Sequence, residues 1–188
     1  MRIIIGITGA SGSIYGVRLI EKLRHHAEAE LHLVMTRAGE RTLFLETGKK
    51  PAELRPLVHC FYSIDDVGAA LASGSFLTDA MVVAPCSVHT MSAIAAGISS
   101  NLLVRAADVV LKERRRLVLM CRETPFHLGH LRTMVALTEM GAIIAPPIPG
   151  FYFKPRTIEE LVDHSVDRVL DLLGLAAADE RRWQPEAR

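Results

Sequence analysis

The feature that most constrains the fold is a regular alternation of short apolar runs with longer stretches that carry apolar residues at helical spacing. Residues 2–8 are apolar on both faces and rich in β-branched side chains, which is typical of a parallel strand covered by helices on both sides. This run ends in a Gly/Ser turn, and residues 14–24 then place apolar side chains three positions apart. Such a stripe suits a helix lying on a sheet, so the two segments predict an opening βα unit.

The same alternation continues almost to the end of the chain. Further strands are expected at 31–35, 58–62, 80–84, 117–121 and 142–145, and further helices at 38–47, 87–96, 102–115, 128–140 and 157–173. Repeated βα order predicts a parallel sheet with right-handed crossovers. The expected fold is therefore a three-layer, doubly wound α/β fold of the flavodoxin/Rossmann type.

The length of the chain favours a single domain. A chain of 188 residues can bury roughly 70% of its unfolded surface in one core. No repeat and no long linker divides it, so we expect a domain over residues 1–174. Residues 175–188 are expected to form a C-terminal arm, whose Trp183 is the only tryptophan and is expected to pack on a neighbouring surface.

Composition excludes several classes of partner. The formal net charge of +1 gives little long-range attraction for nucleic acid. The longest apolar runs are far shorter than the roughly 20 residues that a membrane span needs. Cys60, Cys86 and Cys121 are too scattered for a disulfide framework or a CxxC metal site, and the N-terminus has no signal pattern, so we expect a cytoplasmic protein.

Polar, glycine and proline clusters follow the expected strands. They lie at residues 9–13, 36–37, 85–90, 122–125 and 146–155. In an open parallel sheet, ligands bind beyond the carboxyl ends of the strands, where the strand order reverses. These clusters are therefore expected to converge on one crevice.

The first cluster suits a phosphate. Residues 8–13 read Thr-Gly-Ala-Ser-Gly-Ser between a strand and a helix, where backbone N–H groups and the helix dipole attract anions. The alternative interpretation is a tight turn that needs glycine for steric reasons. The spacing is not GxGxxG, and Thr36 and Arg37 stand where an NAD site would place an acidic residue, so NAD is disfavoured while NADP stays open.

The cluster at residues 85–90 begins another expected helix. Ser87 is a natural N-cap, and capping alone would explain it, but a second Ser/Thr-rich helix start near the first also suits ligand contact. No activating partner for Cys86 is recognisable in the sequence. Cys86 is therefore interpreted as a small packed residue and not as a nucleophile.

Two pairs of charged residues are further candidates. Arg105 and Lys112 lie two helical turns apart on one face, with Asp108 positioned to pair with Lys112; a solvated basic face is the alternative. Arg122 and Glu123 follow a buried strand directly, where they suit phosphate binding and proton transfer, or else a surface ion pair.

Two histidines at the start of an expected helix are candidate metal ligands. His127 and His130 have the i,i+3 spacing that can hold a metal ion. No third ligand is recognisable in the sequence, so they are interpreted as helix-start residues and no metal is expected.

Five motifs in order resemble one known family. They are Thr8–Gly12 with Tyr15-Gly16, Pro85–Ser87, Arg105–Val109 through Leu111–Arg115, Arg122–Pro125, and Pro149–Tyr152 with Pro155. Together they are similar to the UbiX flavin prenyltransferases, and the likeness runs from about Met1 to Leu173.

The resemblance implies a flavodoxin-like protein that joins a dimethylallyl group to N5 and C6 of reduced FMN. The donor would be dimethylallyl monophosphate or the pyrophosphate, and no metal would take part. The product would serve a UbiD-type decarboxylase, in ubiquinone biosynthesis or aromatic acid decarboxylation. The family also implies a large homo-oligomer, a dodecamer.

The resemblance also implies roles for individual residues. FMN would be bound by Gly9, Ala10, Ser11, Thr36, Ser87, Val88, His89, Thr90 and Arg122. The prenyl phosphate would be surrounded by Arg105, Lys112, Glu123, Tyr152 and Arg168, several of them donated across subunit interfaces. Ser11 and Glu46 would relay the proton at flavin N5, and Glu123 would assist the leaving phosphate, so Ser11, Glu46, Glu123 and Lys112 are the expected catalytic residues.

Two positions depart from the family pattern, and two rival functions stay open. Thr36 stands where serine is common, which keeps the hydroxyl, and the residue at His89 varies in the family. An FMN-dependent cysteine decarboxylase would need an early catalytic histidine, but His25 and His26 lie at a helix end expected to point away from the crevice. A carrier that only stores FMN would need no second phosphate site.

Overall fold

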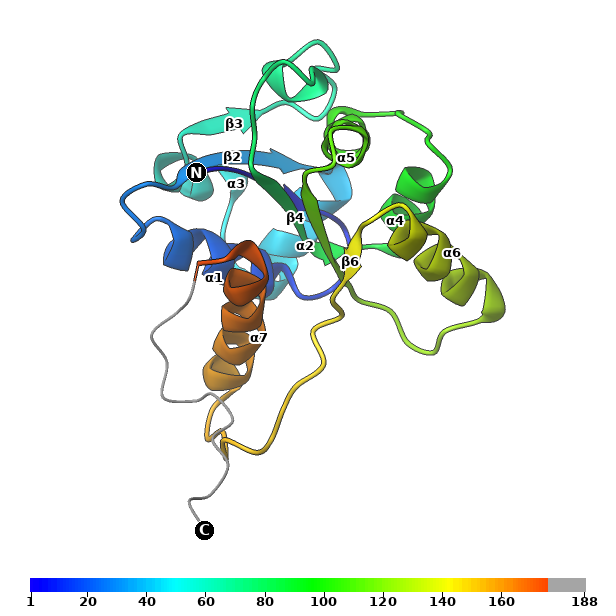
Figure 1. Ribbon diagram of the computed structural model, residues 1–188. Coiled ribbons are helices and arrows are strands. Elements are labelled where there is room, and N and C mark those ends of the chain that lie inside the picture. The colour runs from blue at the N-terminus through cyan, green and yellow to red at the C-terminus, as the bar shows by residue number, and fades with distance from the viewer. Residues whose placement is uncertain (176–188) are drawn as a thin grey trace.

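A single parallel sheet organises the part of the chain that the computed structural model describes, residues 1–175 (Figure 1). Within these residues, six strands lie in the order β3-β2-β1-β4-β5-β6, and every strand pair is parallel. The strands are β1 (Arg2–Ile7), β2 (Glu30–Met35), β3 (Cys60–Tyr62), β4 (Ala80–Cys86), β5 (Arg116–Cys121) and β6 (Ile143–Ile144). This is the Rossmann order of a doubly wound sheet, so the expected fold class is confirmed.

Helices cover both faces of the sheet. The α-helices are α1 (Ser13–Leu23), α2 (Arg37–Thr47), α3 (Pro51–Leu54), α4 (Val88–Ala95), α5 (Leu102–Lys112), α6 (Leu128–Glu139) and α7 (Ile158–Leu173), with short 3₁₀ turns at Arg55–Leu57 and Ala70–Ala72. Helices α1, α2 and α7 contribute to the core on one face, and α4, α5 and α6 to the core on the other.

The two cores explain why the strands are apolar throughout. Side chains alternate between the faces of a strand, so Ile3 and Ile5 of β1 enter one core while Ile4 enters the other. All three are at most 1% exposed. A strand buried on both faces therefore reads as a continuous apolar run, as the sequence predicted.

Several element ends differ from the predictions. Strand β4 does not stop before Pro85 but continues to Cys86. Helix α5 ends at Lys112 and not at Arg115, because Arg114 has a left-handed backbone with φ 57° that a helix cannot continue. The predicted strand at 142–145 is limited to Ile143–Ile144.

Trp183 and most of the expected arm, residues 176–188, lie outside the described part of the chain. Within residues 1–175, no helix combines the length and the apolar character needed to cross a membrane.

Candidate functional site

Thr8 connects the chain segments that follow β1 and β4. These segments leave the sheet toward opposite faces, at the switch point where the strand order reverses. Its side chain is completely buried, and its hydroxyl donates to the carbonyl oxygen of Pro85 at 2.7 Å. The same hydroxyl accepts from the backbone N–H of Ser87 at 2.8 Å. These two hydrogen bonds fix the end of β1 to the start of α4. The crevice therefore lies where β1 and β4 end.

Two glycines bring α2 against the end of β1. A Cβ atom at Gly9 would lie 2.5 Å from the Cβ of Ala38, and one at Gly39 would lie 2.6 Å from the carbonyl oxygen of Ile7. Neither position has room for a side chain. The glycines therefore let the loop after β1 and the start of α2 form one continuous wall.

A cavity of about 510 Å³ opens beside this wall, at the carboxyl ends of the strands. Its lining residues are Gly9, Thr36, Arg37, Ala38, Ile64, Asp65, Ser87, His89, Thr90, Ser100 and Asn101. A cavity of this size falls in the range of small-molecule sites. It brings together five residues that the sequence assigned to one site: Gly9, Thr36, Ser87, His89 and Thr90.

Hydroxyl-bearing residues at two helix N-termini line this cavity. Thr36 caps α2 by accepting from the N–H of Gly39 at 3.0 Å. Ser87 caps α4 by accepting from the N–H of Thr90 at 3.3 Å, and its hydroxyl donates to that of Thr90 at 3.1 Å. Because N-terminal N–H groups and the helix dipole favour anions, this end of the cavity suits a phosphate.

The helix α1 is different, because a carboxylate of the chain occupies its N-terminus. Glu46 accepts from the backbone N–H groups of Gly12 and Ser13, each at 2.9 Å. The prediction that the amides of the glycine turn are open to phosphate is therefore wrong for these two residues. Burial raises the pKa of Glu46, but hydrogen bonds from Ser11, Ser13 and Gly12 outweigh it and hold the pKa below the ordinary value.

The contact between Glu46 and the side chain of Ser11 places the expected relay pair in reach of each other. Neither residue is among those that line the 510 Å³ cavity. Ser11 lies in the adjacent glycine turn, next to Gly12. Glu46 lies in α2, and its carboxylate reaches this turn. The proximity of the pair is confirmed, while its role in proton transfer stays a prediction.

Arg122 and Glu123 lie on the loop after β5, next to the same turn. The N–H of Arg122 donates to the carbonyl oxygen of Cys86 at 3.1 Å, and its Nε donates to the carbonyl oxygen of Ser11 at 3.4 Å. Glu123 accepts from the N–H of Thr124 at 2.9 Å. The exposed guanidinium of Arg122 therefore stands at the rim where the loops after β1, β4 and β5 meet.

Arg105 and Lys112 do not reach the cavity within one chain. Arg105 donates to Asp108 at 2.6 Å and to the carbonyl oxygen of Ala72 at 3.2 Å. Lys112 pairs with its neighbour Glu113. The expected pairing of Asp108 with Lys112 is wrong, because Arg105, three residues before Asp108, takes this carboxylate.

Tyr152 and Arg168 also lie away from the cavity lining. The hydroxyl of Tyr152 is 2.7 Å from Nε2 of His164 on α7. Arg168, on the same helix, is 3.5 Å from Asp171. The five residues expected around a second phosphate are therefore spread over the surface of a single chain.

Cys86 and Val88, at the end of β4 and the start of α4, are both packed. Cys86 is buried, and a hydrogen bond with Cys121 together with burial raises the pKa of its thiol, which agrees with a packed residue. Val88 is packed against the core that contains α4, so only its backbone N–H remains a candidate for ligand contact.

The histidines at the start of α6 form a ring pair. The ring centroids of His127 and His130 are 3.6 Å apart, and the nearby Phe126 packs edge-on against His130. No group of three His, Cys, Asp or Glu side chains within residues 1–175 is placed to hold a metal ion.

Five lining residues lay outside the clusters that the sequence indicated: Ala38, Ile64, Asp65, Ser100 and Asn101. Asn101 had a usable signal, since it precedes an apolar helix and caps α5 by accepting from the N–H of Val104 at 3.0 Å. Asp65 pairs with Arg37 at 2.8 Å. That contact joins the first residue of α2 to the loop after β3, 28 positions away in the sequence, so no local pattern indicated it.

Comparison with known proteins finds similarity over almost the whole chain. The model of the Flavoprotein family matches residues 1–170. The flavin prenyltransferase UbiX of Thauera aromatica is 50% identical over 183 residues, which cover 97% of this chain and 94% of the relative.

Two solved structures superpose closely. The dodecameric FMN-dependent UbiX-like decarboxylase of Escherichia coli O157:H7 is 45% identical with a TM-score of 0.96, over 98% of this chain and 100% of that chain. AnUbiX (PadA1), solved in complex with FMN and dimethylallyl pyrophosphate, is also 45% identical with a TM-score of 0.96, over 99% and 98% of the two chains.

The resemblance noted in the sequence motifs is thus found over almost the whole chain and in three dimensions. The strand order and the similarity in sequence and structure indicate the same family. The chain belongs to the UbiX flavin prenyltransferase family, within the wider Flavoprotein family.

Proposed function

We propose that this protein is a flavin prenyltransferase that joins a dimethylallyl group to N5 and C6 of reduced FMN. The observation that carries the proposal is the cavity at the switch point, where hydroxyl-capped N-termini of α2 and α4 face one volume. The curated relative that is 50% identical is named a flavin prenyltransferase. Reduced FMN would be the electron-rich nucleophile, whose N5 and C6 atoms attack the prenyl group as its phosphate leaves.

The residues around the cavity fit FMN. Its phosphate would accept hydrogen bonds from the hydroxyls of Thr36, Ser87 and Thr90 and from the first N–H groups of α4, at Val88 and His89. These N–H groups have no intrahelical acceptor. The flavin ring would lie against Gly9, Ala10 and Ser11, where small residues permit close approach, and Arg122 would close the rim.

The second phosphate site would be completed by neighbouring subunits. Arg105, Lys112, Tyr152 and Arg168 lie outside the cavity of their own chain, yet they carry the donors that a leaving phosphate needs. A solved relative is described as dodecameric. We therefore assign these residues, with Glu123, to a donor site formed where subunits meet in a homo-oligomer, a dodecamer.

The reaction balances without a metal. The C–O bond of dimethylallyl monophosphate breaks, phosphate leaves, and the prenyl carbon bonds to N5, which loses its proton. Protonation of the remaining alkene and loss of the C6 proton accompany the second bond. Glu46, whose carboxylate contacts the side chain of Ser11, would accept the N5 proton through that hydroxyl, while Lys112 would stabilise and Glu123 would protonate the leaving phosphate.

The proposal includes the wider setting of the reaction. The prenylated flavin would be passed to a UbiD-type decarboxylase, for ubiquinone biosynthesis or aromatic acid decarboxylation, in the cytoplasm. Residues 1–174 would form the catalytic domain and residues 175–188 an arm that packs on a neighbouring surface.

One experiment separates this function from its rivals. The protein is incubated anaerobically with FMN, a reductant and dimethylallyl monophosphate, and the flavin is analysed by mass spectrometry. A flavin heavier by one five-carbon unit is the expected product. Unmodified FMN with tight binding would identify a carrier. In a parallel incubation with oxidised FMN and a C-terminal cysteine peptide, loss of CO₂ with reduction of the flavin would identify a cysteine decarboxylase.

A further inference from the structure

Tyr152 and His164 form a side-chain pair that the proposed mechanism does not use as a pair. The phenolic oxygen of Tyr152 is 2.7 Å from Nε2 of His164, and the two rings meet edge to face with centroids 5.5 Å apart. Tyr152 lies on the loop between β6 and α7, and His164 lies on α7 itself. The contact therefore connects an exposed loop to a regular helix.

The ring of His164 is fixed from two further sides. Phe153 stacks on it with centroids 4.4 Å apart and planes inclined by 17°. A Cβ atom at Gly150 would lie 3.2 Å from Cε1 of His164 and 3.1 Å from Cε1 of Tyr152, so the loop backbone packs closely against both rings. Aromatic packing of this kind restricts the rotamer of the imidazole.

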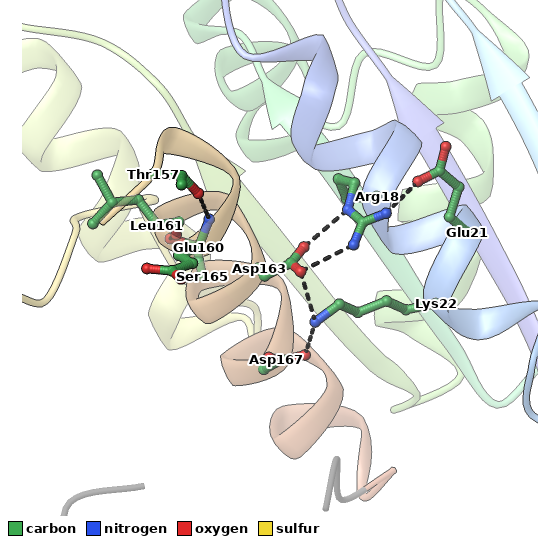
Figure 2. A network of polar contacts seen from close by, with 9 residues as sticks. All are labelled: Arg18, Glu21, Lys22, Thr157, Glu160, Leu161, Asp163, Ser165 and Asp167. Carbon is green, nitrogen blue, oxygen red and sulfur yellow. Dashed lines mark hydrogen bonds and ion pairs between the residues drawn. The ribbon is translucent and has the colours of Figure 1, made fainter. Parts of the chain in front are cut away.

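The helix that carries His164 is itself clamped to α1, as Figure 2 shows. Asp163 accepts from Nε and the second terminal nitrogen of Arg18, both at 2.9 Å. Lys22 pairs with Asp167 one turn further along α7. A bidentate Arg–carboxylate pair of this geometry fixes both direction and distance.

These contacts form a continuous connection to the flavin site. Helix α1 begins directly after Gly12, whose N–H donates to Glu46 in the glycine turn. From that turn, α1 holds α7 through Arg18 and Asp163, and α7 holds Tyr152 through His164. This chain of contacts therefore fixes the position of Tyr152 relative to the flavin cavity.

We propose that His164 is a positioning residue that directs the hydroxyl of Tyr152 toward the phosphate of the prenyl donor. The inference rests on the proposed function for the identity of this phosphate. When Nε2–H of His164 donates to the phenolic oxygen, the hydroxyl hydrogen of Tyr152 is directed to an acceptor other than His164. An anionic phosphate oxygen is such an acceptor, and a hydrogen bond to it is stronger than one between neutral groups.

The test uses three variants of the full-length protein in the prenylation assay. His164→Phe keeps an aromatic ring against Phe153 but removes the hydrogen bond, His164→Gln keeps a donor of similar reach, and Tyr152→Phe removes the hydroxyl. His25→Phe, an exposed histidine at the end of α1, is the matched control. We measure KM for dimethylallyl monophosphate, kcat and the dissociation constant of FMN.

We expect His164→Phe and Tyr152→Phe each to raise KM for the donor about tenfold, the loss of roughly one hydrogen bond to a charged group. FMN affinity should stay unchanged, and the double variant should be no worse than either single one, since both remove the same interaction. His164→Gln and His25→Phe should stay near the parent value.

The two proposals fail in different ways. If the parent protein prenylates FMN and His164→Phe leaves KM unchanged, the positioning role is overturned and the proposed function stands. If the parent forms no prenylated flavin, the proposed function fails and the positioning role fails with it, because no prenyl phosphate is then bound to accept the hydrogen bond of Tyr152.

Discussion

The hydroxyl of Thr8 accepts the backbone N–H of Ser87 at 2.8 Å, across the line where the strand order of the sheet reverses. The same hydroxyl donates to the carbonyl oxygen of Pro85. One buried side chain thus satisfies an acceptor near the end of β4 and a donor in the residue that follows this strand. The position of Ser87, and with it the N-terminus of α4, depends on a residue that is 79 positions away in the sequence.

Thr8→Val should therefore lower both stability and FMN affinity. The variant keeps the shape of the side chain but leaves the N–H of Ser87 without its acceptor, which costs about 1–3 kcal/mol for a buried group. Urea unfolding and FMN titration measure the two effects. Thr8→Ser keeps the hydroxyl and is the control. Equal behaviour of the Val and Ser variants would contradict a role for the hydroxyl.

Gly16→Ala should destabilise the protein by displacing α1 from the sheet. A Cβ atom at this position would lie 2.4 Å from the carbonyl oxygen of Ala84 and 2.9 Å from the side chain of Ile7. Overpacking of this kind costs about 1–3 kcal/mol. Gly68→Ala is the matched control, because its nearest neighbour would be 3.6 Å away. Similar unfolding free energies for both variants would rule out the close contact.

The sequence predicted the fold well because its signals are local. Each buried strand is a continuous apolar run, each covering helix has its own stripe, and strong caps such as Thr36 and Ser87 mark where helices begin. The residues that line the cavity after β1, β2 and β4 followed from the rule that ligands bind at the carboxyl ends of parallel strands.

The contacts that the sequence failed to predict depend on tertiary packing or on side-chain conformations. Glu46 reaches the amides of Gly12 and Ser13 from a helix that begins after the next strand, and nothing near residue 46 indicates which N–H groups it meets. The choice of Arg105 over Lys112 as partner of Asp108 depends on side-chain conformations. The loop at 146–155 lies beside α7, a packing that periodicity does not describe.

Ser87→Ala should weaken FMN binding about tenfold without a matching loss for riboflavin, which has no phosphate. The hydroxyl caps α4 and would donate to the phosphate, and a hydrogen bond to a charged group contributes about 1.5–3 kcal/mol. Fluorescence titrations with both flavins measure the difference. Ser92→Ala, on the exposed side of the same helix, is the control. Equal weakening for FMN and riboflavin would place the phosphate elsewhere.

Glu46→Gln should lower stability at neutral pH, with a penalty that fades in acid. Because hydrogen bonds hold the pKa of Glu46 below its ordinary value, its stabilisation is present above an ordinary carboxyl pKa of about 4.3. It is lost as the pH falls through the lower pKa of the folded state. The unfolding free energies of parent and variant, compared from pH 7 to pH 3, should converge. Glu28→Gln, in an exposed turn, is the control, and a constant difference for Glu46→Gln would contradict the assignment.

Lys112→Ala should leave FMN binding nearly intact while turnover falls by about 100-fold, the usual cost of one donor to a developing charge. Within its own chain Lys112 pairs with Glu113 and lies outside the cavity, so its effect must come through a neighbouring subunit. Mixing Lys112→Ala with an inactive Ser11→Ala variant, after dissociation and reassembly, should therefore restore part of the activity. Lys49→Ala is the matched control. Equal loss of FMN binding and turnover would mean that the second phosphate site has been misplaced, and failure of the mixed oligomer to recover activity would mean that Lys112 acts within its own chain.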